Sequence, residues 1–281
     1  MLSPGLCTQL ACIWEATARK PGNVHRFRDF PDASYVDFLL SAAAIAPVME
    51  KASRQPVGQT VLEAVQATRQ VVATNTNLGI ILLLAPLAAV PPGEALRDGL
   101  ERVLAGLDVA DSRAVYEAIR LARPAGLGSV ADQDVAAEPT LPLRQVMALA
   151  ADRDMIARQY ADGFREVLDE GVPALQEGLR HGSLEGATIL CHLRWMTNHP
   201  DSLIARKRGL KEAEEASRRA RAVLAAGWPE RGDTLLADLD AWLRAEGNAR
   251  NPGTSADLVA ASLFVALREG IIQVPPLTAN A

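Results

Sequence analysis

The stretch that most limits the possible folds is an apolar run from Leu78 to Val90, which contains no charged side chain over thirteen residues. It directly follows the polar sequence Thr74-Asn75-Thr76-Asn77. Short amide and hydroxyl side chains are typical of helix starts, and a helix without a polar face has to be buried on all sides. The run is interrupted by Pro86 and is shorter than the roughly 20 residues that cross a bilayer. It therefore predicts a buried central helix and no membrane span.

The rest of the chain has helical periodicity. Apolar residues three or four positions apart predict helices over 5–18, 32–51, 57–73, 93–107, 109–121, 147–167, 173–180, 183–196 and 233–246, with others beginning near 210 and 253. Residues 123–142 have the composition of a loop, which carries Asp132, Asp134 and Glu138 as candidate magnesium ligands or as solvated acids. The chain lacks a linker and an internal repeat, so we expect one all-α, bundle-like domain over residues 1–281 around the buried central helix.

Composition narrows the possible functions. The formal charge of −5 argues against a nucleic-acid-binding protein, and 49% apolar with 22% charged residues is ordinary for a globular chain. Three cysteines without metal-type spacing suggest reduced thiols, and the first residues do not resemble a signal peptide. We therefore expect a cytoplasmic protein that acts on small molecules, either as a monomer or as a homo-oligomer.

Two polar segments in the first third of the chain are candidate binding elements. In Lys20-Pro21-Gly22, proline forces a turn and glycine permits close approach of the backbone, and the turn leads into Asn23 and His25. The start of the central helix offers Asn75, Thr76 and Asn77 beside free backbone N–H groups, which suit a phosphate or a sugar hydroxyl. The alternatives are a plain turn and simple helix capping.

Two later segments combine acids, cations and turn residues. Asp201 is followed by Arg206, Lys207 and Arg208, a cluster that suits a polyphosphate or a solvated helix end. Further on, Pro252 precedes a predicted helix start whose backbone N–H groups would point outward, as phosphate loops require. The polar residues of this start are Asn251, Gly253, Thr254, Ser255 and Asp257. Asp257 is spaced to close a capping box with Thr254, or to hold a metal-bound phosphate or accept a hydroxyl proton.

Four blocks together resemble the triphosphoribosyl-dephospho-coenzyme A synthase family. They are Lys20-Pro21-Gly22, Asn75-Thr76 with Gly79, Asp201-Ser202 with its basic tail, and the block from Asn251 to Leu258. The resemblance implies an all-helical enzyme that joins the ribose triphosphate of ATP to the 2′-hydroxyl of 3′-dephospho-coenzyme A and releases adenine. The product of that family is the precursor of the prosthetic group of citrate lyase and malonate decarboxylase.

The resemblance also suggests roles for individual residues. Lys20, Arg206 and Arg208 would bind the triphosphate, Asp257 and Asp201 would hold Mg²⁺, and Asp257 or an acid of the 132–154 region would act as the base. The chain departs from the family pattern at Asn77-Leu78, where the family has His-Lys, and after Gly22, where a Gly-Ala-His-x-Asp-Met block is missing. Two alternatives therefore stay open: a related transferase acting on another acceptor in a one-carbon or pterin cofactor pathway, and a non-catalytic helical protein that binds a nucleotide or a partner.

Overall fold

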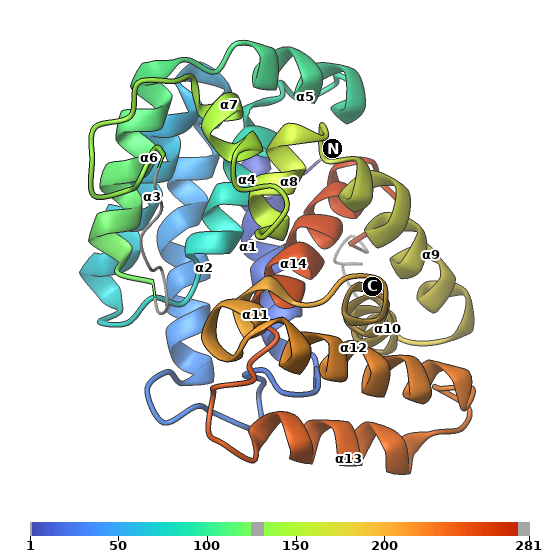
Figure 1. The fold of residues 1–281 in the computed structure, drawn as a ribbon. Helices are drawn as coiled ribbons and strands as arrows, with labels where there is room; N and C mark the ends of the chain where they lie inside the picture. The colour runs from blue at the N-terminus through green and yellow to red at the C-terminus, as the bar shows by residue number, and fades with distance from the viewer. Residues whose placement is uncertain (1, 125–131, 275–281) are drawn as a thin grey trace, which may run out of the picture.

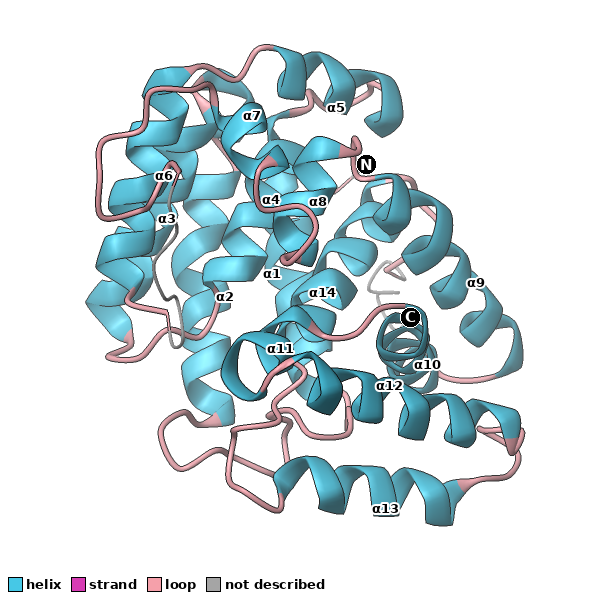
Figure 2. Cartoon of the chain, in the orientation of Figure 1, coloured by secondary structure: helices cyan, strands magenta, loops and turns pink. Residues whose placement is uncertain are grey.

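Helices account for nearly all of the regular structure. The computed structural model describes residues 2–124 and 132–274, which form fourteen α-helices and no β-strand (Figures 1 and 2). The helices are α1 (Pro4–Thr17), α2 (Tyr35–Met49), α3 (Val57–Val71), α4 (Leu78–Ala89), α5 (Leu96–Ala105), α6 (Val109–Ala122), α7 (Leu143–Ala148), α8 (Met155–Ala161), α9 (Val172–His181), α10 (Leu184–Asn198), α11 (Ser202–Arg208), α12 (Leu210–Ala225), α13 (Asp233–Arg244) and α14 (Gly253–Arg268). The predicted all-α class is confirmed.

The predicted central helix is α4, and every residue in it except Gly79 and Ala89 is buried. Pro86 lies inside this helix and cannot donate a hydrogen bond to the carbonyl oxygen of Leu82, four residues earlier. The hydroxyl group of Tyr160 on α8 donates to that oxygen at 2.6 Å instead. A buried carbonyl freed by proline is thus satisfied from a neighbouring helix, and the interruption does not end the helix.

A second helix, α14, is as central as α4. Fourteen of its residues are buried, and it lies beside α4 in the middle of the molecule (Figure 1). The two helices run in the same direction, because Asp257 near the start of α14 contacts Gly79 near the start of α4, whereas Arg268 at the end of α14 donates to the carbonyl oxygen of Val90 at 3.1 Å. Their N-termini therefore open at the same end of the core.

The long helix predicted over 147–167 is wrong, because this segment is divided into α7, α8 and a π-helical turn, η2 (Val167–Gly171). The side chain of Asp154 accepts hydrogen bonds from the backbone N–H groups of Ile156 and Ala157 and starts a new helix. At the other end of α8, Gly163 and Phe164 have φ angles of 68° and 58°, which a helix cannot contain. Helix α11 was likewise not predicted as a helix, and Gly209, at φ 93°, separates it from α12.

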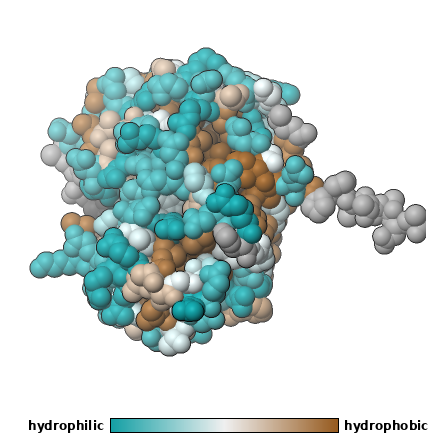
Figure 3. Space-filling model, turned by 90° about the vertical axis from the view of Figure 1, so that its right-hand side faces the viewer, coloured by the Kyte–Doolittle hydropathy of each residue, from teal (hydrophilic) through white to brown (hydrophobic). Residues whose placement is uncertain are grey.

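Two hydrophobic clusters make up the interior. The larger surrounds α4 and α14, and a smaller one joins α10, α11, α12 and α13. Helix α10 contributes Cys191 to the first cluster and Leu193 to the second, so we infer that both belong to one domain. Among the described residues no helix is long and apolar enough to cross a membrane. The face in Figure 3 carries hydrophilic side chains around most of its edge and apolar ones nearer its middle.

Candidate functional site

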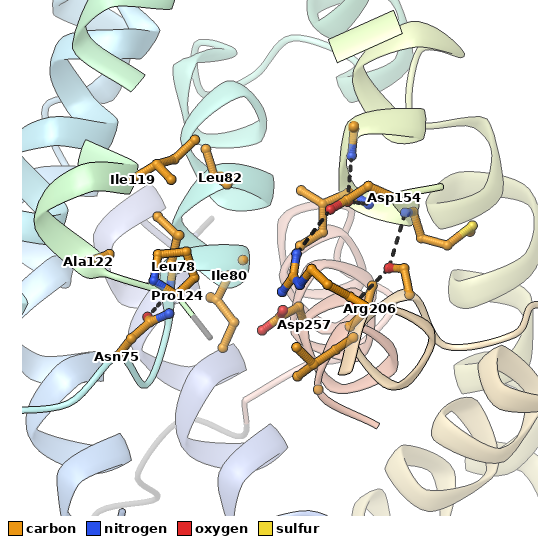
Figure 4. Close-up of a pocket in the computed structure, with 18 of the residues that line it drawn as sticks. Asn75, Leu78, Ile80, Leu82, Ile119, Ala122, Pro124, Asp154, Arg206 and Asp257 are labelled. Atoms are coloured by element: carbon orange, nitrogen blue, oxygen red, sulfur yellow. Dashed lines mark hydrogen bonds and ion pairs between the residues drawn. The ribbon is translucent and has the colours of Figure 1, made fainter. Parts of the chain in front are cut away.

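A cavity of about 1080 Å³ opens at the common N-terminal end of α4 and α14. Its wall combines residues from the α3–α4 connection, α4, α6, α8, α11 and the start of α14. Figure 4 shows two chemically different parts. Leu78 and Leu82 of α4 and Ile119 and Ala122 of α6 line an apolar lobe, and Asp154, Arg206 and Asp257 surround a polar lobe.

The polar lobe is bordered by two helix N-termini, those of α4 and α14. The start of a helix carries unpaired backbone N–H groups and the positive end of the helix dipole, both of which favour a bound anion. Gly79 permits the close approach of the two helices, because a Cβ atom at this position would lie 2.0 Å from Oδ2 of Asp257. The glycine therefore has a steric function between the two helices.

Replacing Gly79 with Ala should displace the Asp257 carboxylate. We expect the free energy of unfolding to fall by about 1–3 kcal/mol, as for other overpacked interiors, together with a loss of activity. Chemical denaturation and steady-state kinetics measure the two effects. The control is Gly186→Ala on α10, where the nearest atom to the new methyl group is 3.6 Å away. A Gly79→Ala variant with full activity and stability would show that the contact is unimportant.

Asp257 borders the cavity, and its carboxylate has no hydrogen-bond donor among the described residues (Figure 4). Burial raises its pKa well above the ordinary value, and the neighbouring carboxylates Glu15, Asp201 and Asp154 raise it further, while Arg206 opposes them. The capping box with Thr254, one interpretation of the sequence, does not form, because α14 has no side-chain cap. A partly exposed carboxylate with a raised pKa is suited to accept a proton.

Asp201, the other acid expected to act in catalysis or metal binding, is buried and connects two helices. One oxygen atom accepts from the backbone N–H groups of Leu203 and Ile204 and caps α11. The other accepts from the backbone N–H and the hydroxyl group of Ser255, each at 2.8 Å. Because both oxygen atoms are occupied by donors, Asp201 and Ser255 fix the start of α14 beside α11.

Ser202 and Thr254 continue this connection toward α8. The hydroxyl group of Ser202 donates to Oγ1 of Thr254 at 3.0 Å and accepts from the backbone N–H group of Met155 at 3.3 Å. Ser202, Gly253 and Thr254 all border the cavity. The starts of α8, α11 and α14 are therefore hydrogen-bonded to one another around the polar lobe.

The basic tail after Asp201 forms α11, and this helix separates its cations. Arg206 and Lys207 border the cavity, with Nη1 of Arg206 at 3.6 Å from Oδ2 of Asp154. Arg208 is not part of the cavity wall and forms an ion pair of 2.8 Å with Glu246. Residues two apart lie on different faces of a helix, so Arg206 and Arg208 cannot share a ligand on one side. Lys207 was predicted only as a member of the basic cluster, without a role of its own, and a helix start at Asp201 would have distinguished the three positions.

Of the residues predicted from the Lys20-Pro21-Gly22 turn and its continuation, some border the cavity and others do not. Asn23 borders the cavity, and its amide group donates to the side chain of Asn251 at 3.0 Å, which joins the beginning and the end of the chain. Gly22, at φ 73°, donates its N–H group to Asp240 on α13 at 2.7 Å.

His25 is not in the cavity wall, and burial, with the nearby Arg244 and Lys20, lowers its pKa to about 4. It is therefore neutral at pH 7.

The polar residues before α4 mostly stabilise its start. Asn75 accepts from the backbone N–H group of Leu78 at 3.1 Å. Thr76 shares a hydrogen bond with Ser41, and the amide group of Asn77 donates to Thr68 at 3.1 Å. All three border the cavity, but Thr76 and Asn77 are buried.

Lys20 is completely buried and does not border the cavity. Its ammonium group lies 2.9 Å from Oε1 of Glu15 and donates to the carbonyl oxygen of the same residue at 2.5 Å. Glu15 is also buried and does border the cavity. Helical periodicity did not predict that Glu15 belongs to the site, because this acid lies among apolar residues of α1. Lys20 thus forms a buried ion pair behind the cavity wall.

Replacing Lys20 with Met should leave the Glu15 carboxylate without its cation. Breaking one partner of a buried pair typically costs about 3–5 kcal/mol of unfolding free energy, and urea denaturation would measure this loss. The double variant Glu15→Gln, Lys20→Met removes the unpaired charge and should recover a large part of it. Equal stability of the single and double variants would contradict the role of the pair.

The acids were also considered as metal ligands. Among the described residues, no group of three or more His, Cys, Asp or Glu side chains is arranged to hold a metal ion. Asp201 does not fit as a ligand, because its oxygen atoms already accept four hydrogen bonds. Asp154 is also occupied, because Oδ1 caps α8 and Oδ2 lies 3.6 Å from Nη1 of Arg206. Asp257 therefore fits best the requirement of Mg²⁺ in nucleotide sites, which is one or two carboxylates in addition to phosphate oxygens.

Comparisons with known proteins identify the class and then the family. A solved structure from Archaeoglobus fulgidus, described as a candidate triphosphoribosyl-dephospho-CoA synthase, has a TM-score of 0.66 and 28% sequence identity. The match covers 83% of this chain and 99% of that one. No curated protein matches the chain. The fold and the comparisons therefore define an all-helical transferase.

The family model for ATP:dephospho-CoA triphosphoribosyl transferase (CitG) matches residues 1–274. The chain belongs to this family, in agreement with the resemblance found in the sequence. Family membership favours triphosphoribosyl transfer to dephospho-CoA, with ATP as a substrate, over the alternatives of another acceptor or a non-catalytic binding protein.

Proposed function

We propose that this protein transfers the triphosphoribosyl group of ATP to the 2′-hydroxyl of 3′-dephospho-CoA and releases adenine, with Asp257 as the general base. The observation that carries this proposal is the position of Asp257. Its carboxylate has no hydrogen-bond donor among the described residues, has a raised pKa and lies between two helix N-termini, next to Arg206. Family membership supplies the two substrates.

The triphosphate fits the polar lobe by charge. Arg206 and Lys207 supply cations, and the N-termini of α4 and α14 supply backbone N–H groups and the positive ends of two helix dipoles. Arg153 and Arg158 add two more guanidinium groups to the cavity wall. Binding the phosphates at several points orients the ribose, which contributes to the rate by restricting C1′ to a reactive position.

The proposed reaction is a substitution at C1′ of the ATP ribose. The bond between C1′ and the adenine nitrogen breaks, the bond between C1′ and the acceptor 2′-oxygen forms, and adenine leaves with the bonding electrons. Asp257 accepts the proton of the acceptor hydroxyl and later returns it to water, and the departing adenine takes up one proton from water, so that charge and atoms balance. Positive charge on the ribose ring is stabilised by the carboxylates Asp257, Asp154 and Glu15 at the cavity wall.

Magnesium belongs to the same proposal. When bound on the triphosphate, it would neutralise phosphate charge, and Asp257 is the side chain that would contact it. Positions at the cavity wall support roles in binding for Arg206, Asn23, Asn251 and Thr254. We do not assign phosphate binding to Lys20 or Arg208, since each has an acidic partner outside the cavity.

The experiment that tests the proposal measures adenine released from ATP with and without dephospho-CoA. We expect release that depends on both substrates, together with a product whose mass is that of dephospho-CoA plus a ribose triphosphate. ATP binding without adenine release in the presence of dephospho-CoA would contradict the proposed reaction.

A further inference from the structure

The apolar lobe of the cavity is a separate binding surface within the site. Leu78 and Leu82 of α4 face Ile119 and Ala122 of α6 across it, and Pro124 lies at its edge (Figure 4). Val115, Val146 and Met147 extend the same apolar wall. These side chains carry no charge, and phosphates would lose hydration against them, so this surface suits an uncharged, largely apolar group.

Two consecutive polar residues before α4 border the cavity and have unused hydrogen-bonding capacity, and the second of them, Asn75, lies beside the apolar lobe (Figure 4). The hydroxyl oxygen of Thr74 is buried and has no hydrogen-bond partner among the described residues, although Thr74 borders the cavity. The neighbouring Asn75 uses its oxygen atom to cap α4, which leaves its NH₂ group available to the cavity. A buried hydroxyl without a partner is unfavourable, and a ligand that carries both donors and acceptors would satisfy it.

The order of charged and apolar side chains across the cavity indicates the orientation in which a nucleotide would bind. Arg206 lies on one side of Asp257, and Ile80, Leu78 and Ile119 follow on the other side (Figure 4). In ATP, the ribose separates the triphosphate from the base. With the phosphates at Arg206 and C1′ at Asp257, the base extends toward the apolar lobe.

We propose that the apolar lobe between α4 and α6 binds the purine ring of the nucleotide donor, with Thr74 and Asn75 as partners of its polar edge. This inference rests on the proposed function and adds the position of the leaving group. A purine has two apolar faces and a polar edge, which matches an apolar slot with donors and acceptors at one rim. The acceptor hydroxyl then approaches C1′ from the side opposite the base, which is the side of Asp257.

The inference is tested by filling the lobe. Ile119→Trp should weaken binding of ATP by at least about tenfold, because the larger side chain occupies the space in which the base would be buried. Binding of inorganic tripolyphosphate, which has no base, should stay within about twofold of the wild type, since the apolar lobe makes no phosphate contact. The matched control is Leu121→Trp on the same helix, because Leu121 is exposed and does not border the cavity.

Thr74→Val provides a second measurement that does not depend on tolerance of a large side chain. It retains the shape of the residue and removes its hydroxyl group, and we expect weaker ATP binding with unchanged binding of tripolyphosphate. Unchanged ATP binding in both variants would overturn the inference. So would a loss of dephospho-CoA binding while ATP binding is retained, because the lobe would then hold the acceptor. Failure of the proposed function is distinct: the wild-type protein would bind ATP without transferring its ribose triphosphate.

Discussion

Replacing Asp257 with Asn should reduce kcat for triphosphoribosyl transfer by about 10²- to 10⁴-fold, the usual contribution of a general base. Asparagine has nearly the same shape, so it fits against Gly79, but it cannot accept the proton of the acceptor hydroxyl. Affinity for ATP should change far less than kcat. Single-turnover measurements of adenine release, with ATP binding determined separately, would distinguish the two effects.

The same variant has an expected effect on stability, and its sign follows from the raised pKa of Asp257. Because the carboxyl group binds its proton more tightly in the folded protein than in the unfolded chain, its ionisation lowers stability as the pH rises through the folded-state pKa. Asp257→Asn should therefore be at least as stable as the wild type at neutral pH, and the difference should disappear in acid. Thermal unfolding at several pH values would measure this.

The activity of the wild type should fall as the pH decreases through the raised pKa of Asp257, since only the ionised carboxylate can accept a proton.

The control variant for the Asn substitution is Asp98→Asn on α5, which is exposed and does not border the cavity. Near-normal turnover by Asp257→Asn would exclude this residue as the base.

Replacing Arg206 with Ala should weaken ATP binding by about 10- to 100-fold, because hydrogen bonds to charged groups contribute about 1.5–3 kcal/mol. Inorganic tripolyphosphate should lose affinity to a similar extent, since the contact is with phosphate. Isothermal titration calorimetry would measure both ligands.

Arg208→Ala is the matched control for this experiment. It removes an identical side chain two residues away on the same helix, but Arg208 pairs with Glu246 outside the cavity. We expect nearly unchanged ATP binding by this variant. Equal effects of the two substitutions would indicate a general change in charge and would contradict a specific phosphate contact at Arg206.

Much of the fold can be predicted from the sequence, because helical periodicity and helix-start residues are local properties. The absence of charge from Leu78 to Val90 was sufficient to predict a central buried helix, and α4 confirms it. The division of 147–167 was not predictable from periodicity, since it depends on the cap formed by Asp154 and on the positive φ angles of Gly163 and Phe164. The central position of α14 was also missed, because its burial depends on packing against α4.

Less of the candidate site can be predicted from the sequence, because the same residue types occur in binding sites and in purely structural contacts. The sequence suggested catalytic and metal-binding roles for both Asp201 and Asp257, but donors occupy both oxygen atoms of Asp201, whereas no described residue donates to Asp257. Lys20 pairs with Glu15, an acid that no local pattern selected. Arg206 and Arg208 differ only in the face of α11 that each occupies. These distinctions arise from contacts between distant segments.

The parallel pairing of α4 with the last helix has a consequence for biosynthesis. During translation, α4 emerges long before α14, so the side of α4 that packs against α14 stays uncovered until nearly all of the protein has been made, although α3 and α5 can already pack on its other sides. Exposed apolar surface of this kind favours aggregation and chaperone binding. A premature stop before Gly253 would therefore yield an insoluble product in addition to an inactive one.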